Sequence, residues 1–326
     1  MKDRITDVPG IRVGHAQDAR SARGATVILC ETSVSAAVEV RGGAPGTRET
    51  DCLNPVNSVQ APHAIYFGGG SAFGLAGATG VMKWLREKGI GFNAWGNIVP
   101  IVPGAVIFDL TVGDGLAYPD ERMGYEACQN AGVEVAQGVV GAGMGAVVGW
   151  ASDLDRRMKG GLGTASAAAG NLIVGALVVV NCWGDVIDQD SGEVVAGTLN
   201  ETGDGFPGSL GLLASRQMKA GAGVTTNTTI GVIACNAKLT KPQMMRVAMM
   251  ANDGYARAIV PSHTAMEGDT IFAVATGEVD ADVNLVGALA AEAMARAIVK
   301  GVKESASAYG YLGHREVFER MRKKGR

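Results

Sequence analysis

The stretch GVTTNTTIGVIACN, residues 223–236, joins two halves of opposite character. Its second half, from Thr229 to Cys235, is apolar and rich in β-branched residues, which predicts a buried strand. Its first half crowds four threonines around Asn227, where the chain enters this strand. Asn bonds its own backbone in turns and Thr favours strands, so a simple turn is one interpretation. The other interpretation is a reactive site built from hydroxyl groups at the start of the strand.

The chain on both sides of this stretch repeats the strand pattern. Short apolar runs bounded by Gly, Pro, Asn or Asp predict further strands. These runs are ATVILC (25–30), AAVEV (36–40), PIVPGAVIFDL (100–110), VEVAQGVV (133–140), AVVGWA (146–151), LIVGALVVV (172–180) and TIFAVATG (270–277).

Three segments between these runs predict helices instead. Residues 71–89 offer Ser71 as N-cap, an apolar stripe and Gly89 as the C-terminal glycine. Residues 240–254 open with Thr and Gln at the spacing of a capping box, and residues 282–303 carry another apolar stripe. Strands interspersed with long helices predict a layered α/β or α+β domain.

Glycine is the most unusual feature of the composition. Its 48 residues are about twice the usual share, which predicts tight turns and close packing between layers. Residues 197–227 are rich in Gly, Thr, Ser and Asn and have weak periodicity. We expect a long exposed loop within one domain spanning residues 1–326, because the strand after it resumes the earlier composition.

Bulk composition excludes several classes of function. Hydrophobic residues make 47% of the chain and charged residues 19%, as in globular proteins. A net charge of −3 argues against a nucleic-acid partner. The basic tail, residues 314–326, contains two glutamates and predicts a solvated terminal helix. Residues 160–184 lack charge, but polar residues interrupt them, so we expect a buried strand and no membrane partner.

The start of the chain has no apolar signal core, and we therefore expect a cytoplasmic protein. The five cysteines are scattered and include no CxxC, which suits buried thiols in a reducing compartment. The four histidines lie far apart, with no HExxH or similar spacing, so we predict no metal and no cofactor.

Two glycine motifs raise the alternative of a nucleotide site. GAGMGA (141–146) fits the dinucleotide fingerprint, but the residues after it predict a strand where the fingerprint requires a helix. KGGLGTAS (159–166) has the residue types of a phosphate loop in the wrong order. Gly68–Ser71 places main-chain amides at a helix start, where they would hold an anion or form a tight turn capped by Ser71.

The strongest candidate chemistry joins residues 223–236 to HTAMEGDTIFA (263–273). If the Asn227–Thr228 bond is cut, Thr228 gains a free α-amine that can serve as base for its own hydroxyl nucleophile. Glu267 and Asp269 are two residues apart, so on an extended segment both would point to one face and orient the amine. Carboxylates raise the pKa of an amine, so a nearby cation would balance them.

Two further residues complete this hypothesis. Lys159 is our candidate for the balancing cation, and the Asn181 carboxamide, at the end of a predicted strand, is our candidate oxyanion donor. Each residue also has an ordinary interpretation: EGD as a turn, Lys159 as a surface charge and Asn181 as a capping amide. Spacing along the sequence does not decide between the two.

Six motifs in one order resemble the self-processing L-aminopeptidase/D-esterase family, which includes β-peptidyl aminopeptidases and nylon-oligomer hydrolases. The resemblance covers nearly the whole chain. The motifs are DVPGIRVGHAQD (7–18), GGSAFGLAGATGVMKWLREKGIGF (69–92), VPIVPGAVIFDL (99–110), KGGLGTAS (159–166), NTTIGVIACNAKLTK (227–241) and HTAMEGDTIFAVATG (263–277).

The resemblance implies cleavage between Asn227 and Thr228, leaving fragments 1–227 and 228–326, with Thr228 as the N-terminal nucleophile. It assigns Glu267 and Asp269 as the paired acids, Lys159 as the lysine and Asn181 as the oxyanion residue. It implies a four-layer α/β/β/α sandwich, shared with the ornithine acetyltransferases, and a homotetramer. The expected partner is a small-molecule or short-peptide substrate, with nylon-type amide oligomers slightly favoured.

Two departures from the family pattern stand out. EGD replaces the expected DGD at Glu267, and Phe108 lies where some relatives place a tyrosine near the oxyanion. Three alternatives stay open. They are an acyltransferase of the ornithine acetyltransferase type, a nucleotide-dependent enzyme and a family member that folds without cutting itself.

Overall fold

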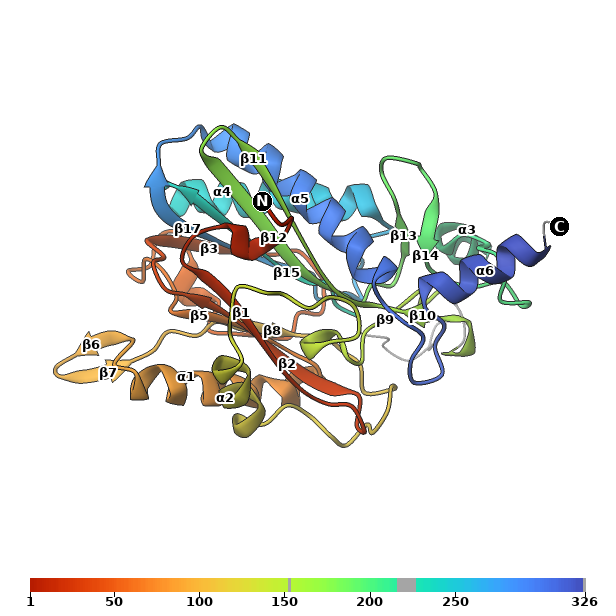
Figure 1. Cartoon of the computed structure of the whole chain (residues 1–326), viewed down its shortest axis with the longest axis horizontal. Coiled ribbons are helices and arrows are strands. Elements are labelled where there is room, and N and C mark those ends of the chain that lie inside the picture. Colours follow the sequence, from red (N-terminus) through yellow and green to blue (C-terminus); the bar gives the residue numbers. More distant parts are fainter. Residues whose placement is uncertain (152–153, 216–226, 325–326) are drawn as a thin grey trace.

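The computed structural model describes residues 1–151, 154–215 and 227–324. Two five-stranded sheets form its centre (Figure 1). Sheet I has the strand order β1-β2-β5-β8-β4, formed by Ile11–Asp18, Arg23–Cys30, Ala64–Gly68, Gly104–Val106 and Thr47–Arg48. Sheet II has the order β11-β12-β15-β17-β3, formed by Gly161–Ala169, Leu172–Val180, Ile230–Ala237, Thr270–Val279 and Ser35–Val40.

Smaller elements surround the two sheets. A hairpin joins β6 (Phe92–Ala94) to β7 (Asn97–Val99), β9 (Val147–Val148) pairs with β10 (Met158–Lys159), and a third small sheet contains β13 (Asp185–Ile187), β14 (Val194–Ala196) and β16 (Ile259–Val260). Single 3₁₀ turns span Ile5–Asp7 (η1), Asp51–Leu53 (η2), Gly141–Gly143 (η4) and Leu154–Arg156 (η5).

Helices cover the outer face of each sheet (Figure 1). Sheet II carries α4 (Lys241–Ala258) and α5 (Val283–Lys303), which also pack against each other. Sheet I carries α1 (Gly77–Glu87) and α2 (Glu121–Gln129). Two further helices, α3 (Ser209–Ser215) and α6 (His314–Lys324), lie at the side of the molecule near β13 and β14.

The position of strand β15 between two hydrophobic cores explains why its sequence is apolar without alternation. Val232 and Ala234 belong to the core between the two sheets, whereas Ile233 and Cys235 belong to the core under α4 and α5. A strand covered on both faces has no solvent side, so every position favours an apolar residue. Between the sheets, the rings of Phe67 and Phe272 lie 6.0 Å apart. Burial of a phenylalanine side chain stabilises the folded state by roughly 1.5–3 kcal/mol relative to leaving it exposed.

Glycine permits the close packing that its abundance predicts. A Cβ at Gly163 of β11 would lie 2.0 Å from the Ala297 carbonyl oxygen and 2.4 Å from the Gly301 nitrogen, both in α5. Any side chain at this position would push the helix away from sheet II.

Four of the six predicted helix ends agree with the structure, including Lys303 at the end of α5, whereas α4 continues to Ala258, past the predicted end at residue 254. The capping box of Thr240 and Gln243 is formed, and Asp282 caps α5 through the main-chain N–H groups of Asn284 and Leu285. Gly89 follows α1 with a φ of 72°, as a C-terminal glycine does.

The predicted cap at Ser71 is wrong. Ser71 has a φ of 53° and starts a 3₁₀ helix, η3 (Ser71–Ala76), that precedes α1. The Asp109 carboxylate accepts a hydrogen bond from the Gly70 N–H at 2.7 Å instead. The main-chain amides of this turn therefore hold an anion, and that anion belongs to the chain itself.

Two predicted strands are also corrected. Residues 133–140 form no strand, because Gly138 adopts a φ of 83° and interrupts the extended run. Within residues 100–110 only β8 is extended in a sheet. GAGMGA forms η4 followed by β9, so the helix that a dinucleotide site requires does not follow it.

Residues 197–227 are a loop only in part. The helix α3 lies within them, and the buried Asp185 carboxylate accepts hydrogen bonds from Thr198 N–H at 3.0 Å and from the Ser209 hydroxyl at 2.6 Å. Residues 216–226, which the loop prediction also covers, lie outside the described residues.

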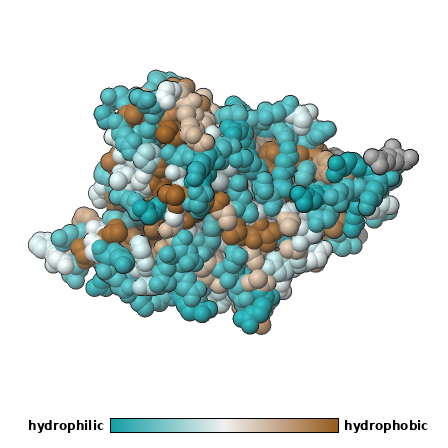
Figure 2. All heavy atoms as spheres, viewed as in Figure 1, coloured by the Kyte–Doolittle hydropathy of each residue, from teal (hydrophilic) through white to brown (hydrophobic). Residues whose placement is uncertain are grey.

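The face of the molecule in Figure 2 is largely hydrophilic, with smaller apolar patches between polar residues. The β6–β7 hairpin extends beyond the helices (Figure 1) and carries the exposed side chains of Phe92 and Trp95. Within residues 1–151, 154–215 and 227–324, no helix combines the length and apolar character that crossing a bilayer requires.

Candidate active site

Sheet II brings the predicted residues to one end of its three central strands. The parallel strands β15 and β17 both begin at this end, and antiparallel β12 finishes there. Thr228 lies just before β15, Asp269 just before β17 and Asn181 just after β12. These three residues, up to 88 positions apart in sequence (269 minus 181), thus meet because of strand direction.

Main-chain hydrogen bonds hold the Asn227–Thr228 peptide on both sides. The Thr228 N–H donates to the Asn181 carbonyl at 3.1 Å, and the Gly268 N–H donates to the Asn227 carbonyl at 2.8 Å. The Thr228 hydroxyl also donates to the Asn227 carbonyl oxygen, at 2.6 Å. Asn227 and Thr228 are both buried. The hydroxyl therefore lies against the carbonyl group of the bond that the sequence predicts to be cut.

Gly268 separates the two acidic residues and permits this approach. A Cβ at Gly268 would lie 2.7 Å from the Thr228 hydroxyl oxygen and 2.7 Å from the Ala44 carbonyl oxygen. The Ala44 N–H in turn donates to the Glu267 carbonyl at 2.8 Å, and the Arg41 N–H donates to the Asp269 carbonyl at 2.9 Å. Residues 41–44 thus fix the main chain of residues 267–269 through hydrogen bonds.

Both carboxylates are buried and accept main-chain hydrogen bonds. The oxygens of Glu267 accept from Trp183 N–H at 3.0 Å and from Thr264 N–H at 2.9 Å. Asp269 accepts from Thr229 N–H at 2.9 Å. Among the described residues, no hydrogen bond joins either carboxylate to the Thr228 hydroxyl. In the uncut chain the two acids therefore fix the main chain around Thr228.

The pKa of Glu267 is raised to about 7. Burial is the largest cause, and the neighbouring charge of Asp269 acts in the same direction, against the N–H donors of Trp183 and Thr264. A carboxyl group with a pKa near neutrality can exchange a proton under ordinary conditions, as acid–base catalysis requires.

Lys159 is fully buried, so its interpretation as a surface charge is wrong. Its Nζ donates to the carbonyl oxygens of Gly160 at 3.1 Å and Gly143 at 3.3 Å, and also to that of Ala146. Burial lowers the pKa of Lys159 to about 7, while the negative charge of Asp109 opposes the shift.

Lys159 and Asn181 hold opposite ends of one peptide group. The Ala146 carbonyl accepts from Lys159, and the Val147 N–H donates to the Asn181 side-chain oxygen at 3.0 Å. The Asn181 Nδ2 donates to the Phe108 carbonyl at 3.1 Å. Phe108 thus contacts Asn181 through its main chain, while its ring packs edge-on against Trp150 with 6.1 Å between centroids.

Three further parts of this centre, Asp109, Gly268 and His263, were not predicted from the sequence. Asp109 is fully buried, lies 3.7 Å from the Arg23 guanidinium and has its pKa raised to about 6, chiefly by burial. An aspartate inside the apolar run GAVIFDL was the available signal for it, because buried carboxylates need partners. The Gly268 N–H and the His263 ring gave no such signal.

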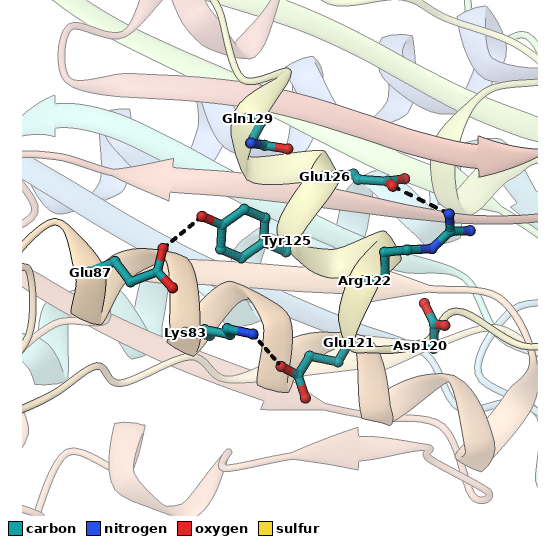
Figure 3. Close-up of a pocket in the computed structure, with 8 residues that line it drawn as sticks. All are labelled: Lys83, Glu87, Asp120, Glu121, Arg122, Tyr125, Glu126 and Gln129. Carbon is teal, nitrogen blue, oxygen red and sulfur yellow. Dashed lines mark hydrogen bonds and ion pairs between the residues drawn. The ribbon is translucent and has the colours of Figure 1, made fainter.

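A pocket of about 630 Å³ lies at the surface of α1 and α2 (Figure 3) and shares no residue with this centre. Its side chains pair with one another: Lys83 with Glu121 at 3.3 Å, and Tyr125 with Glu87 at 2.6 Å. These contacts are typical of neighbouring solvated helices.

The pattern that defines Peptidase family S58 matches residues 3–316. The chain belongs to this family. The resemblance stated from the sequence motifs is confirmed.

Two curated proteins are similar to this chain over most of its length. An uncharacterized aminopeptidase of Mycobacterium tuberculosis (strain ATCC 25618 / H37Rv) is 44% identical over 342 aligned positions, covering 96% of this chain and 97% of its own length. A 6-aminohexanoate-oligomer endohydrolase of Kocuria sp. (strain KY2) is 31% identical over 315 positions, covering 91% of this chain and 85% of its own length.

The fold is similar to that of a solved structure. An L-aminopeptidase D-Ala-esterase/amidase from Ochrobactrum anthropi, described as a variant of the Ntn hydrolase fold, aligns with a TM-score of 0.71 and 19% identity. The alignment covers 99% of this chain and 94% of that one. This S58 member therefore has a mixed α/β fold like that of the solved enzyme, and it is a hydrolase of amide or peptide bonds.

Proposed function

We propose that this S58 hydrolase cuts itself between Asn227 and Thr228 and then uses Thr228 as an N-terminal nucleophile. One observation carries the proposal. The Thr228 hydroxyl lies 2.6 Å from the Asn227 carbonyl oxygen, and the Gly268 N–H already donates to that same oxygen. A nucleophile beside a carbonyl whose oxygen is held by a donor is the arrangement that acyl transfer requires.

In the cutting step, the Thr228 oxygen attacks the Asn227 carbonyl carbon. The negative charge that develops on the carbonyl oxygen is stabilised by the Gly268 N–H. The C–N bond breaks, the hydroxyl proton passes to the departing nitrogen, and an ester joins Asn227 to Thr228. Water then hydrolyses this ester, which leaves a carboxylate on Asn227 and a free amine and hydroxyl on Thr228.

The cut converts the Thr228 nitrogen into a base within reach of its own hydroxyl. An α-amine has an ordinary pKa of about 7.7–8.0, so part of it is neutral near pH 7. The Asn181 carbonyl, which accepts from this nitrogen in the uncut chain, is placed to orient the amine. In turnover the amine takes the hydroxyl proton as Thr228 attacks a substrate amide, then gives it to the leaving amine, and water releases the acyl group.

Asn181 and Lys159 support the oxyanion in this proposal. The Asn181 Nδ2 carries two hydrogens, and its bond to the Phe108 carbonyl uses one of them. The second is the proposed donor to the substrate oxyanion. Lys159 positions Asn181 through the peptide between Ala146 and Val147, which both side chains hold.

We predict that Glu267 makes the stability of the uncut protein depend on pH. Its folded pKa of about 7 lies above the unfolded value of 4.5. The folded state therefore binds more protons between these values, and the contribution of Glu267 to the unfolding free energy is lost as pH rises through this window. In a Thr228→Val chain, which stays uncut, Glu267→Gln should gain stability relative to its parent from pH 5 to pH 7.5.

Urea unfolding of the two Thr228→Val proteins at both pH values measures this difference. The other buried titratable groups are the same in both chains, so the comparison reports on Glu267 together with its interaction with Asp269. A difference in unfolding free energy that does not change with pH would contradict the raised pKa of Glu267.

The substrates we propose are short peptides, small amides and linear amide oligomers with a free amine. The names of the relatives, aminopeptidase and 6-aminohexanoate-oligomer endohydrolase, support this range. Assays of the matured protein with amino-acid anilides, amino-acid amides and 6-aminohexanoate oligomers test it. Hydrolysis of at least one class is expected. Acetyl transfer from acetylornithine to glutamate, with no hydrolysis, would instead indicate an acyltransferase.

Two features of the architecture are part of the same proposal. The packing of α1 and α2 on sheet I, and of α4 and α5 on sheet II, supports a four-layer α/β/β/α sandwich. The family resemblance implies a tetramer, and the exposed Phe92 and Trp95 of the β6–β7 hairpin offer an apolar contact for further copies of the chain. Light scattering of the purified protein tests the tetramer directly.

A further inference from the structure

His263 adopts a main-chain conformation that few histidines have. Its φ is 56°, in the left-handed region, and its side chain is 18% exposed. Such a conformation persists where surrounding contacts hold it. Here both the main chain and the ring of His263 reach the same oxygen of Asp269: the N–H at 3.1 Å and Nδ1 at 2.8 Å.

The other oxygen of Asp269 contacts the main chain next to the nucleophile. It accepts the N–H of Thr229, the residue directly after Thr228, at 2.9 Å. In the tautomer that satisfies the contact, the His263 Nδ1 carries the hydrogen and donates to the carboxylate. His263 therefore fixes the rotation of the Asp269 carboxylate, and the carboxylate fixes the peptide that follows Thr228.

The His263 ring is itself held in place. It stacks on Tyr255, with ring centroids 5.7 Å apart and planes 25° apart. The buried Tyr255 hydroxyl is 3.3 Å from the carbonyl of Thr229, just before β15, and 3.4 Å from the carbonyl of Thr270, at the start of β17. The ring that supports His263 is thus fastened to the same main chain that His263 positions through Asp269.

We propose that His263 is a positioning residue for the Thr228 nucleophile, acting through Asp269 and the Thr229 N–H. The inference rests on the proposed function. The inference also predicts that His263 matters more for substrate turnover than for self-cutting. Before the cut, hydrogen bonds to Asn227 hold Thr228 from the preceding side, through Met266 and Gly268. After the cut those bonds no longer act on Thr228. The hydrogen bond from the Thr229 N–H to Asp269 then becomes more important for the position of Thr228.

The test compares three substitutions of His263. His263→Asn keeps a donor near the Nδ1 position and tolerates the left-handed conformation, but it lacks the ring. His263→Phe keeps a ring to stack on Tyr255 but has no donor. His263→Ala lacks both, and repeats the comparison if the phenylalanine protein does not fold. Circular dichroism and thermal unfolding confirm folding of each protein before the assays.

The measured quantities are the first-order rate of self-cutting and the kcat and KM of the matured protein on one amide substrate. We expect His263→Asn to stay within about threefold of wild type in kcat. We expect His263→Phe and His263→Ala to lose roughly 10-fold or more in kcat with KM within about twofold, and to lose less in the cutting rate. Wild-type kcat in His263→Phe, or equal loss in His263→Asn and His263→Phe, would overturn the inference.

A parallel Thr228→Val protein separates this inference from the proposed function. If Thr228→Val still cuts itself and turns over substrate, the proposed function fails. If Thr228→Val is inert while His263→Phe and His263→Ala both keep wild-type kcat, the nucleophile stands and the role of His263 alone is overturned.

Discussion

Thr228→Val is expected to leave the chain intact and to lower amide hydrolysis by roughly 10³-fold or more, as removal of a nucleophile does in other hydrolases. The substitution keeps the branched shape and the buried position of the side chain, and removes only the hydroxyl that lies 2.6 Å from the Asn227 carbonyl oxygen. Gel electrophoresis and intact mass follow the cutting, and release of a chromogenic amine follows turnover.

Thr229→Val is the matched control for this prediction. Thr229 is adjacent and fully buried, and its hydroxyl has no hydrogen-bond partner among the described residues. Loss of an unpaired buried hydroxyl is nearly neutral or stabilising, while the main-chain bond from Thr229 to Asp269 is kept. We expect this protein to cut itself and to turn over. Activity in Thr228→Val together with inactivity in Thr229→Val would indicate that Thr229 is the nucleophile.

Asp269→Asn is expected to slow both cutting and turnover by roughly 10²-fold, which corresponds to about 2.7 kcal/mol in the barrier. The carboxylate accepts on both of its oxygens, from Thr229 on one side and from His263 on the other. An asparagine has one acceptor oxygen, so its NH₂ group must face either the Thr229 N–H or the His263 N–H. Either arrangement leaves a buried donor unpaired and displaces the main chain beside Thr228.

Asp282→Asn is the control for a carboxylate that caps main-chain N–H groups elsewhere. Asp282 accepts from Asn284 and Leu285 at the start of α5, where asparagine is also a good cap. We expect wild-type cutting and turnover in this protein. An equal loss in Asp269→Asn and Asp282→Asn would show that the effect at Asp269 is a general loss of stability.

The sequence was most informative where one strand or helix determines the outcome by itself. The apolar run after Thr229 could be predicted as β15 because a strand buried on both faces has a continuous hydrophobic pattern. The capping box at Thr240 was equally local. The site residues Thr228, Glu267, Asp269 and Asn181 came from chemistry and family resemblance, and strand direction in sheet II brings them together.

What the sequence did not reveal depends on contacts between distant segments. Asp109 takes the capping position predicted for Ser71, because sheet I places the Asp109 carboxylate against the amide of Gly70. The Gly268 N–H became a candidate oxyanion donor only through the pairing of Asn227 beside Glu267. His263 was part of a quoted motif, but its contact with Asp269 depends on a left-handed turn that sequence spacing does not predict.

The most direct test of the account is the covalent state of the purified wild-type chain, followed by intact mass and by sequencing of every N-terminus. The account predicts two fragments of 227 and 99 residues, the smaller starting Thr228-Thr229-Ile230 with a free amine, and hydrolytic activity that rises as they accumulate. A folded 326-residue chain that stays uncut through prolonged incubation, yet hydrolyses amides at a constant rate from the start, would contradict it.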